Sequence, residues 1–176
     1  MNYERKTIKQ KGLRMMTECF VRQSFFRAFT AVFQGGLMME KVRELAAQYQ
    51  QAGNNCAETV VKVCNDCLDL KLPPETLRMV SVLGGGVAGS GCLCGALNGA
   101  CLVLGCLVGR TTPEEKTKAE VNQPVREFQK IWLDRFHATC CRVLKSPANG
   151  GPVSCGDLMA DTSAMLIDFI REKKLA

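Results

Sequence analysis

Cysteine is the residue type in this chain that is best suited to do chemistry. The sequence holds 11 cysteines among 176 residues, and an odd count does not suit a framework of paired structural disulfides. The first residues lack the apolar stretch and small-residue cleavage site of a secretory signal, so we expect a reducing, cytoplasmic compartment. In that compartment the cysteines act as thiols, metal ligands or redox-active disulfides, because stable structural disulfides are rare there.

Three of the cysteines come at signals that start a helix. Cys56 and Cys155 directly follow the capping residues Asn55 and Ser154, and Cys94 lies just ahead of a long apolar segment. The free amides and the dipole at a helix N-terminus stabilise negative charge and so favour the thiolate form. These positions therefore indicate nucleophiles or metal ligands, although cysteine also serves as a small apolar residue.

A C-x-x-C motif, Cys64 to Cys67, falls near the end of a predicted helix instead of after a strand. This context disfavours a thioredoxin-type site and leaves open a second redox pair or a pair of metal ligands. Cys92 and Cys140 each lie beside a candidate cysteine and could add ligands or redox neighbours.

The remaining cysteines and the histidine are weaker candidates for a chemical role. Cys101 and Cys106 lie inside the apolar segment, where we expect them to contribute to packing. His137 is the only histidine, so a zinc finger with two histidine ligands is excluded. Ligation of zinc or an iron–sulfur cluster by cysteines alone stays open.

The elements that position these cysteines are predicted to be helices. From residue 39 onward, apolar residues recur at helical spacing between capping and stop signals. We expect an all-α fold, a compact bundle of about six helices around a central apolar, small-residue helix. The expected helices cover residues 39–51, 55–70, 73–83, 95–109, 112–144 with an interruption or kink near Pro124, and 154–174.

The segment between Arg78 and Arg110 contains no charged residue. Its length would allow a membrane span. However, its first third is rich in glycine, it has no tryptophan or tyrosine for the interface, and the flanking basic residues show no clear asymmetry. We therefore favour a central helix hidden by its neighbours over a membrane span.

The positive charge of the chain belongs to its N-terminal part. Residues 1–37 hold seven basic and two acidic side chains, whereas the remainder holds 16 basic and 15 acidic ones. Because residues 38–176 are nearly neutral, they lack the clustered positive charge that a nucleic-acid partner would require. The residues from Gln34 to Met39 match a translated ribosome-binding site followed by start codons. We therefore expect residues 1–37 to be a start-site artefact, a dispensable tail or a targeting helix, and residues 38–176 to be one cysteine-rich helical domain.

The order of the motifs resembles one known family, the redox-active proteins called C_GCAxxG_C_C, over residues 39–172. The matching segments are Asn55-Cys56-Ala57, Gly84-Gly85-Gly86, Cys94-Gly95-Ala96-Leu97-Asn98-Gly99, Cys141-Arg142 and Cys155. The resemblance implies a small, helical, cytosolic protein of bacteria or archaea, related to the cysteine-bearing domain of split-Soret cytochromes. It places the family's four signature cysteines at Cys56, Cys94, Cys141 and Cys155, with Arg142 favouring Cys141 over Cys140.

Two kinds of chemistry are open to these four cysteines. In the first they carry out thiol–disulfide exchange or electron transfer with a redox partner protein, as in a thiol–disulfide oxidoreductase. In the second they hold zinc or an iron–sulfur cluster, and the protein is an electron carrier or sensor. Cys94, between a glycine-rich loop and a helix start, is expected to be the most consequential thiolate. The small-residue helical surfaces also suit a homodimer.

Overall fold

The structure, a computed structural model, describes residues 36–146 and 154–176. Residues 1–40 and 41–176 form two separate compact units. The predicted extension, residues 1–37, falls almost wholly outside the described residues, and its boundary stays a prediction. A first helix covers residues 36–51 and crosses from one unit into the other.

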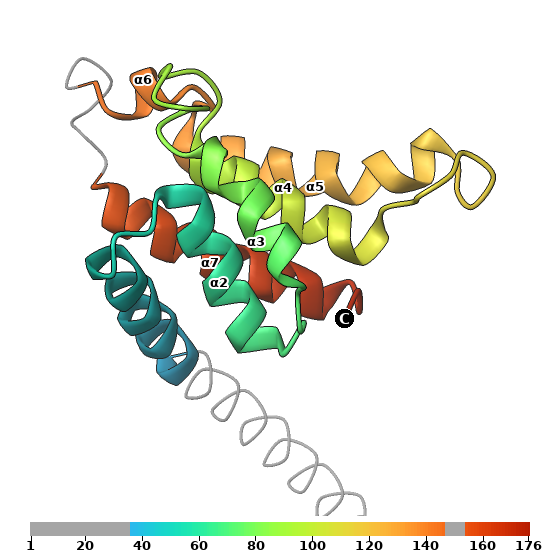
Figure 1. Ribbon diagram of the computed structural model, residues 1–176, viewed down its shortest axis with the longest axis horizontal. Coiled ribbons are helices and arrows are strands. Elements are labelled where there is room, and N and C mark those ends of the chain that lie inside the picture. Colours follow the sequence, from blue (N-terminus) through green and yellow to red (C-terminus); the bar gives the residue numbers. More distant parts are fainter. Residues whose placement is uncertain (1–35, 147–153) are drawn as a thin grey trace, which may run out of the picture. The chain divides into compact units, whose positions relative to one another are not determined.

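The second unit is built from helices. Within the described ranges there is no strand beyond one isolated bridge between Leu93 and Cys140, so the all-α prediction is confirmed. After the first helix come α2 (Cys56–Leu68), α3 (Pro74–Val80), the 3-10 turn η1 (Ser81–Leu83), α4 (Gly95–Val108), α5 (Lys118–Phe136), α6 (Cys141–Leu144) and α7 (Cys155–Glu172) (Figure 1).

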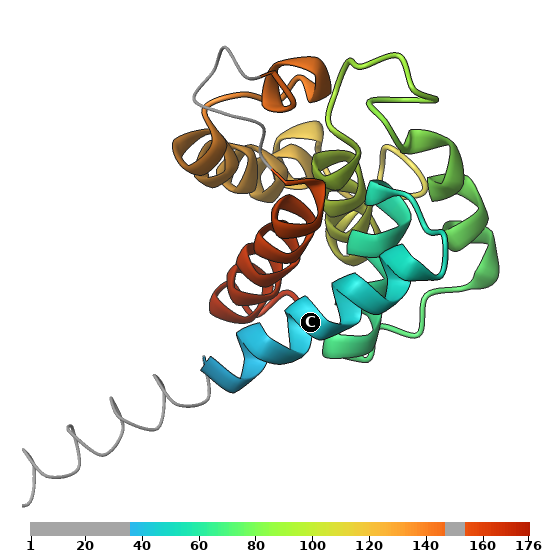
Figure 2. The ribbon, with the colours of Figure 1, turned by 90° about the vertical axis from the view of Figure 1, so that its left-hand side faces the viewer.

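Helix α4 lies at the centre of the bundle, as its apolar sequence predicts. It packs against α2, α5 and α7 (Figure 2). Small residues, Gly95, Ala96, Gly99 and Ala100, make up its first turns. A Cβ atom on Gly99 would lie 2.7 Å from the carbonyl oxygen of Ala57. Because no side chain separates the two backbones there, α2 approaches α4 more closely than larger residues would allow.

The fifth predicted helix begins and ends at other residues than expected. Its capping box is formed by Thr117 and Glu120, whereas Thr112 lies in the preceding turn. Pro124 stays within the helix, and His137 ends it in the left-handed conformation, with φ of 57°. The predicted continuation to residue 144 is therefore wrong. The chain becomes extended at Cys140 and then forms the separate short helix α6.

The core between α5 and α7 is aromatic. Phe128 and Trp132 are fully buried, and the ring of Phe128 lies 5.7 Å from that of Phe169. The indole N–H of Trp132 donates to the carbonyl oxygen of Ala138, 2.9 Å away. This bond supports the chain just after α5, where it turns toward the cysteines of the predicted site.

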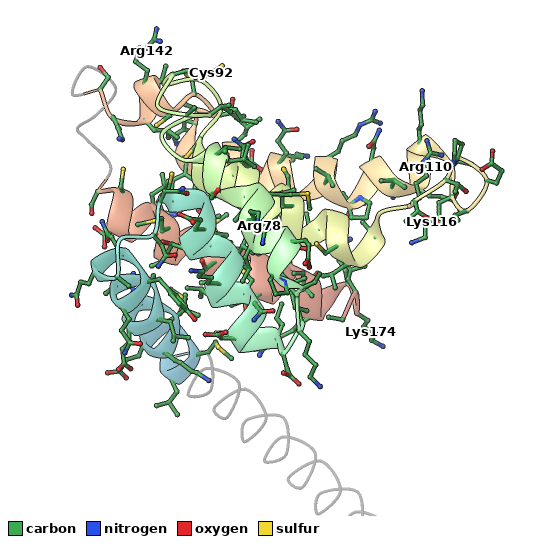
Figure 3. All side chains as sticks on the ribbon, viewed as in Figure 1. Arg78, Cys92, Arg110, Lys116, Arg142 and Lys174 are labelled. Carbon is green, nitrogen blue, oxygen red and sulfur yellow. The ribbon has the colours of Figure 1, made fainter. Side chains whose placement is uncertain are left out.

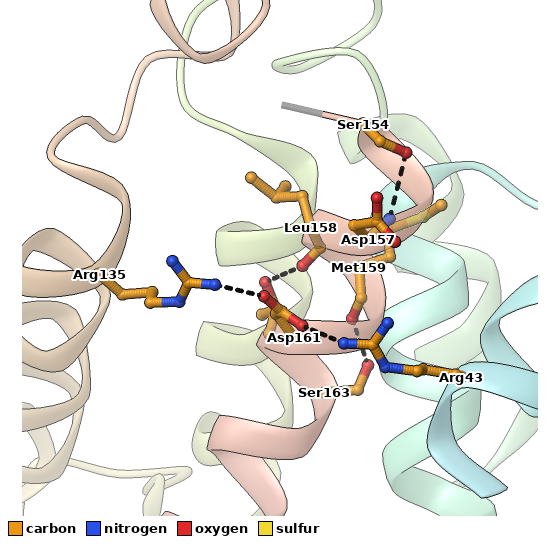
Figure 4. Close-up of polar contacts among 9 residues, drawn as sticks. Arg43, Arg135, Ser154, Asp157, Leu158, Met159, Asp161 and Ser163 are labelled. Carbon is orange, nitrogen blue, oxygen red and sulfur yellow. Dashed lines mark hydrogen bonds and ion pairs between the residues drawn. The ribbon is translucent and has the colours of Figure 1, made fainter. Parts of the chain in front are cut away.

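One carboxylate ties α7 to two other helices. Asp161 accepts from Arg135 of α5 at 2.9 Å and from Arg43 of the first helix at 3.4 Å (Figure 4). Both guanidinium groups are largely exposed, so each ion pair contributes about 0–1 kcal/mol. The pairs fix the register of the three helices more than they stabilise the fold.

None of the helices in the described part of the chain is both long enough and apolar enough to cross a lipid bilayer.

Candidate functional site

The four cysteines singled out by the sequence all lie where a helix begins. Cys56 and Cys155 are the first residues of α2 and α7, and Cys94 is the N-cap of α4. Cys141 was not expected in this setting, yet it is the first residue of α6. The structure thus places all four thiols near free backbone amides, although α6 has only four residues.

Cys56 contacts the backbone at the start of α4. Its Sγ atom lies 2.3 Å from the position that a Cβ atom of Gly95 would take. The carbonyl oxygen of Leu83 lies 2.9 Å from the same position. Gly95 is therefore glycine because a thiol and a carbonyl occupy the space of a side chain, and this contact brings Cys56 next to Cys94.

The side chain of Asn55 fixes the start of α2 in two directions. Its Oδ1 atom accepts from the amides of Ala57 and Glu58, while its Nδ2 atom donates to the carbonyl oxygen of Ser81 at 2.7 Å. The Glu58 carboxylate accepts in return from the Asn55 amide at 2.9 Å, which completes the capping box. A Cβ atom on Gly84 would lie 2.6 Å from the Asn55 side chain. Asn55 and Gly84 therefore fix the N-terminus of α2, which carries Cys56, against η1.

The segment before α4 pairs with the segment before α6. Around the bridge of Leu93 with Cys140, the Cys94 amide donates to the Thr139 carbonyl at 2.7 Å. The Cys141 amide donates to the Cys92 carbonyl at 2.5 Å. These antiparallel bonds hold Cys94 and Cys141 on neighbouring chain segments although 47 positions separate them in the sequence.

The glycine-rich loop between η1 and Cys92 follows a left-handed path. Five consecutive residues, 85–89, have positive φ, and among them Val87 and Ala88 are not glycine. At Gly86 a Cβ atom would lie 2.6 Å from the Cys92 amide nitrogen and 2.9 Å from the Cys141 Cβ atom. The loop thus turns sharply against both cysteines, which is the role that its glycines suggest.

Burial decides the protonation of Cys94. The side chain is buried, and desolvation raises its pKa to about 11. The amides of Leu97 and Ala96 act in the opposite direction, as expected at a helix N-terminus, but they do not balance the burial. The prediction of a thiolate stabilised by the helix start is therefore wrong for Cys94 in this structure.

Electrostatic interactions connect the four thiols through Cys94 and Cys141. Burial raises the pKa of Cys141, and negative charge on Cys56, Cys155 or Cys140 raises it further, whereas Lys145 lowers it. Charge on Cys56 and Cys141 likewise raises the pKa of Cys94. Cys141 lies at the centre of this set, because it interacts with each of the other three predicted site cysteines.

The C-x-x-C motif lies apart from these thiols. Cys64 is eight residues beyond Cys56 on α2, a rise of about 12 Å along the helix axis. It is fully buried, and both burial and the neighbouring Cys67 raise its pKa. The pKa of Cys67 is raised mainly by burial, and the charges of Lys41 and Arg171 lower it.

The remaining candidates divide between core and surface. Cys101 is half-buried, and desolvation raises its pKa, which agrees with a packing role. Cys106 is exposed near the end of α4, so the expectation that it packs in the core is wrong. Partial burial still raises the pKa of its thiol, and a hydrogen bond with Thr76 of α3 lowers it. His137 is exposed and serves as the C-cap of α5.

All ten cysteines within the described ranges are free thiols. Among residues 36–146 and 154–176, no three His, Cys, Asp or Glu side chains are arranged so that they could hold a metal ion. The four candidate thiols, all of them within these ranges, therefore form no such group as placed.

Comparison with known proteins decides the family. A family model described as "Putative redox-active protein (C_GCAxxG_C_C)" matches residues 54–169. The chain belongs to the C_GCAxxG_C_C family. The matched region runs from the cap of α2 into α7 and includes all four cysteines that the resemblance indicates. No curated protein and no solved structure matches this member of the C_GCAxxG_C_C family.

Sequence reasoning missed two features that shape the site. The pairing of Leu93 with Cys140 joins segments far apart in the chain, and no local pattern announces it. The contact of Cys56 with Gly95 could have been suspected, because a glycine directly after a capping cysteine has no role in propagating a helix. Gly84 has a negative φ, so its backbone conformation does not require glycine. It is glycine because the Asn55 side chain occupies the space that a Cβ atom would take.

Proposed function

We propose that this protein is a thiol–disulfide redox protein whose central pair is Cys56 and Cys94. The contact between the Cys56 Sγ atom and the backbone of Gly95 carries the proposal, because it brings one thiol directly beside the residue that follows the other. We assign Cys141 and Cys155 as the second pair of thiols, since negative charge on Cys155 raises the pKa of Cys141.

The reaction passes two electrons from the thiols to a disulfide of a partner protein. One thiolate attacks a partner sulfur and forms a mixed disulfide, and the partner's other sulfur leaves as a thiolate. A second thiol of this chain then displaces the partner and closes an internal disulfide. The two protons lost by the thiols protonate the partner's sulfur atoms. Such chemistry suits the reducing compartment, and the cytoplasmic location, that the cysteine usage indicates.

Disulfide mapping tests the proposal. The anaerobically purified, full-length protein is oxidised with glutathione disulfide and analysed by peptide mass spectrometry. We expect a colourless protein in which a disulfide joins Cys56 to Cys94, and the loss of this disulfide in Cys56→Ser. Cys64→Ser is the matched control, since Cys64 lies on the same helix but away from the site.

Two outcomes would overturn the proposal. A brown protein with stoichiometric iron and sulfide would show that the four cysteines hold a cluster, the alternative that their number suggests. A disulfide pattern that leaves both Cys56 and Cys94 reduced after complete oxidation would exclude them as the central pair.

A further inference from the structure

The two most buried site thiols are poorly placed to meet a disulfide on another protein. The Cys94 and Cys141 side chains are only 3% and 5% exposed. The high pKa of Cys94, about 11, also leaves few thiolates at neutral pH. A thiol at the surface of the same site would therefore make the first contact more readily than either of them.

Cys92 is such a thiol. It is exposed and lies two residues before Cys94, at the end of the glycine-rich loop. Figure 3 shows it on the outside of this loop, at the same end of the molecule as Arg142 and away from Arg110 and Lys116. Cys92 is not one of the four signature cysteines, so neither the family match nor the proposed function gives it a role.

The backbone holds Cys92 directly opposite Cys141. With Leu93 facing Cys140 in the antiparallel bridge, the next pair outward is Cys92 and Cys141, and the Cys141 amide donates to the Cys92 carbonyl. The Cys92 amide is fixed from the other side by the Gly86 carbonyl, at 3.2 Å. Opposite residues of this kind have Cα atoms about 5.5 Å apart, within the range that a disulfide spans.

A second observation agrees with this proximity. The Cys92 nitrogen and the Cys141 Cβ atom lie 2.6 Å and 2.9 Å from one point, the position of a Cβ atom on Gly86. Cys140 is less suited to pair with Cys92, because its thiol donates to the Gly91 carbonyl at 3.2 Å and it faces Leu93. The exposed Cys92 therefore lies opposite one buried cysteine, Cys141, across the paired segments.

We infer that Cys92 is the entry thiol of the site and passes a partner's disulfide to Cys141, an inference that rests on the proposed thiol–disulfide function. The Cys92 thiolate attacks the partner disulfide, forms a mixed disulfide and releases one partner thiolate. The Cys141 thiolate then attacks the Cys92 sulfur, forms a Cys92–Cys141 disulfide and releases the second partner thiolate.

Two further exchanges carry the disulfide inward. Cys94 attacks Cys141 and frees Cys92, and Cys56 then attacks Cys94 and frees Cys141. The end product is the Cys56–Cys94 disulfide with Cys92 and Cys141 again reduced, so two thiols have lost two electrons and two protons to the partner. Every step exchanges one sulfur for another and needs no further oxidant.

Glutathione disulfide serves as the probe, and Cys106 is a control within the same molecule. Both Cys92 and Cys106 are exposed, but only Cys92 has a thiol opposite it. In the wild-type protein we expect glutathione to stay on Cys106 and to be absent from Cys92. In Cys141→Ser we expect it to stay on Cys92 as well, and in Cys94→Ser we expect a Cys92–Cys141 disulfide to accumulate.

Cys92→Ser gives an independent reading that does not depend on changing a buried residue. We expect the Cys56–Cys94 disulfide to form about tenfold more slowly in this variant and at the wild-type rate in Cys106→Ser. Formation at the wild-type rate in Cys92→Ser, or glutathione retained on Cys92 while Cys141 is intact, would overturn the relay. Absence of the Cys56–Cys94 disulfide in the wild type would instead overturn the proposed function.

Discussion

Gly95→Ala is the sharpest perturbation that the structure offers. The added methyl group would lie 2.3 Å from the Cys56 sulfur and 2.9 Å from the Leu83 carbonyl oxygen. The thiol can rotate away, but the carbonyl belongs to the backbone and cannot move without displacing η1. We therefore expect the substitution to push Cys56 away from Cys94 and to strain the start of α4.

The magnitude follows from two opposing effects. Overpacking of a buried position costs about 1–3 kcal/mol, and replacing a helical glycine by alanine returns up to about 1 kcal/mol. We expect a net loss of about 1–2 kcal/mol in the free energy of unfolding. Because misplacement of a reacting group by about 1 Å slows a reaction up to about 100-fold, formation of the Cys56–Cys94 disulfide should slow by about 10- to 100-fold.

Gly105→Ala is the matched control on the same helix. Gly105 is exposed, and nothing lies within 4 Å of a Cβ atom placed there. This variant should gain about 0.5–1 kcal/mol and oxidise at the wild-type rate. Urea denaturation and timed disulfide mapping measure the two quantities. If Gly95→Ala were as stable as Gly105→Ala and formed the disulfide at the wild-type rate, the assigned contact would be refuted.

Three further outcomes follow from the described residues. The folded-state pKa of Cys94, about 11, lies above its ordinary value of 9. The protonated thiol therefore contributes stability that is fully present below pH 9 and is lost as the pH rises through 11. In Cys94→Ser, the free energy of unfolding should change less with pH over this range. Val87→Gly should gain about 0.5–1 kcal/mol in urea denaturation, because valine at φ of 66° is strained, whereas Val82→Gly, also exposed but not at positive φ, should lose stability. Deleting residues 1–37 should leave the melting temperature within about 3 °C of the full chain, since Arg43 and its bond to Asp161 remain; a larger fall would contradict a dispensable extension.

The local parts of the fold could be predicted from the sequence. A capping box needs only residues within one turn, so the pattern from Asn55 to Glu58 predicted the start of α2 correctly. The apolar, small-residue segment after Cys94 likewise predicted the central helix α4. At the fifth helix two similar signals competed, and Thr117 forms the capping box whereas Thr112, chosen from the sequence, does not.

The environment of each thiol could not be predicted in this way. The position of Cys94 at a helix start indicated a lowered pKa, but burial beneath the neighbouring segments raises it instead. Desolvation depends on what the rest of the chain places around a group, and a few neighbouring residues in the sequence do not contain that information. Cys106 shows the reverse case, since an apolar segment suggested burial and the end of α4 is exposed.

The sequence by itself determined the family, the helical class and three of the four site cysteines that stand at helix starts, because these depend on residue types and on spacing within a turn. Only the tertiary structure decided that Cys56 contacts Gly95 and that Cys92 stands opposite Cys141. Both contacts join segments that are more than 35 residues apart in the chain. They arise from the packing of α2 on α4 and from one antiparallel bridge, and such long-range pairing leaves no periodic trace in either segment.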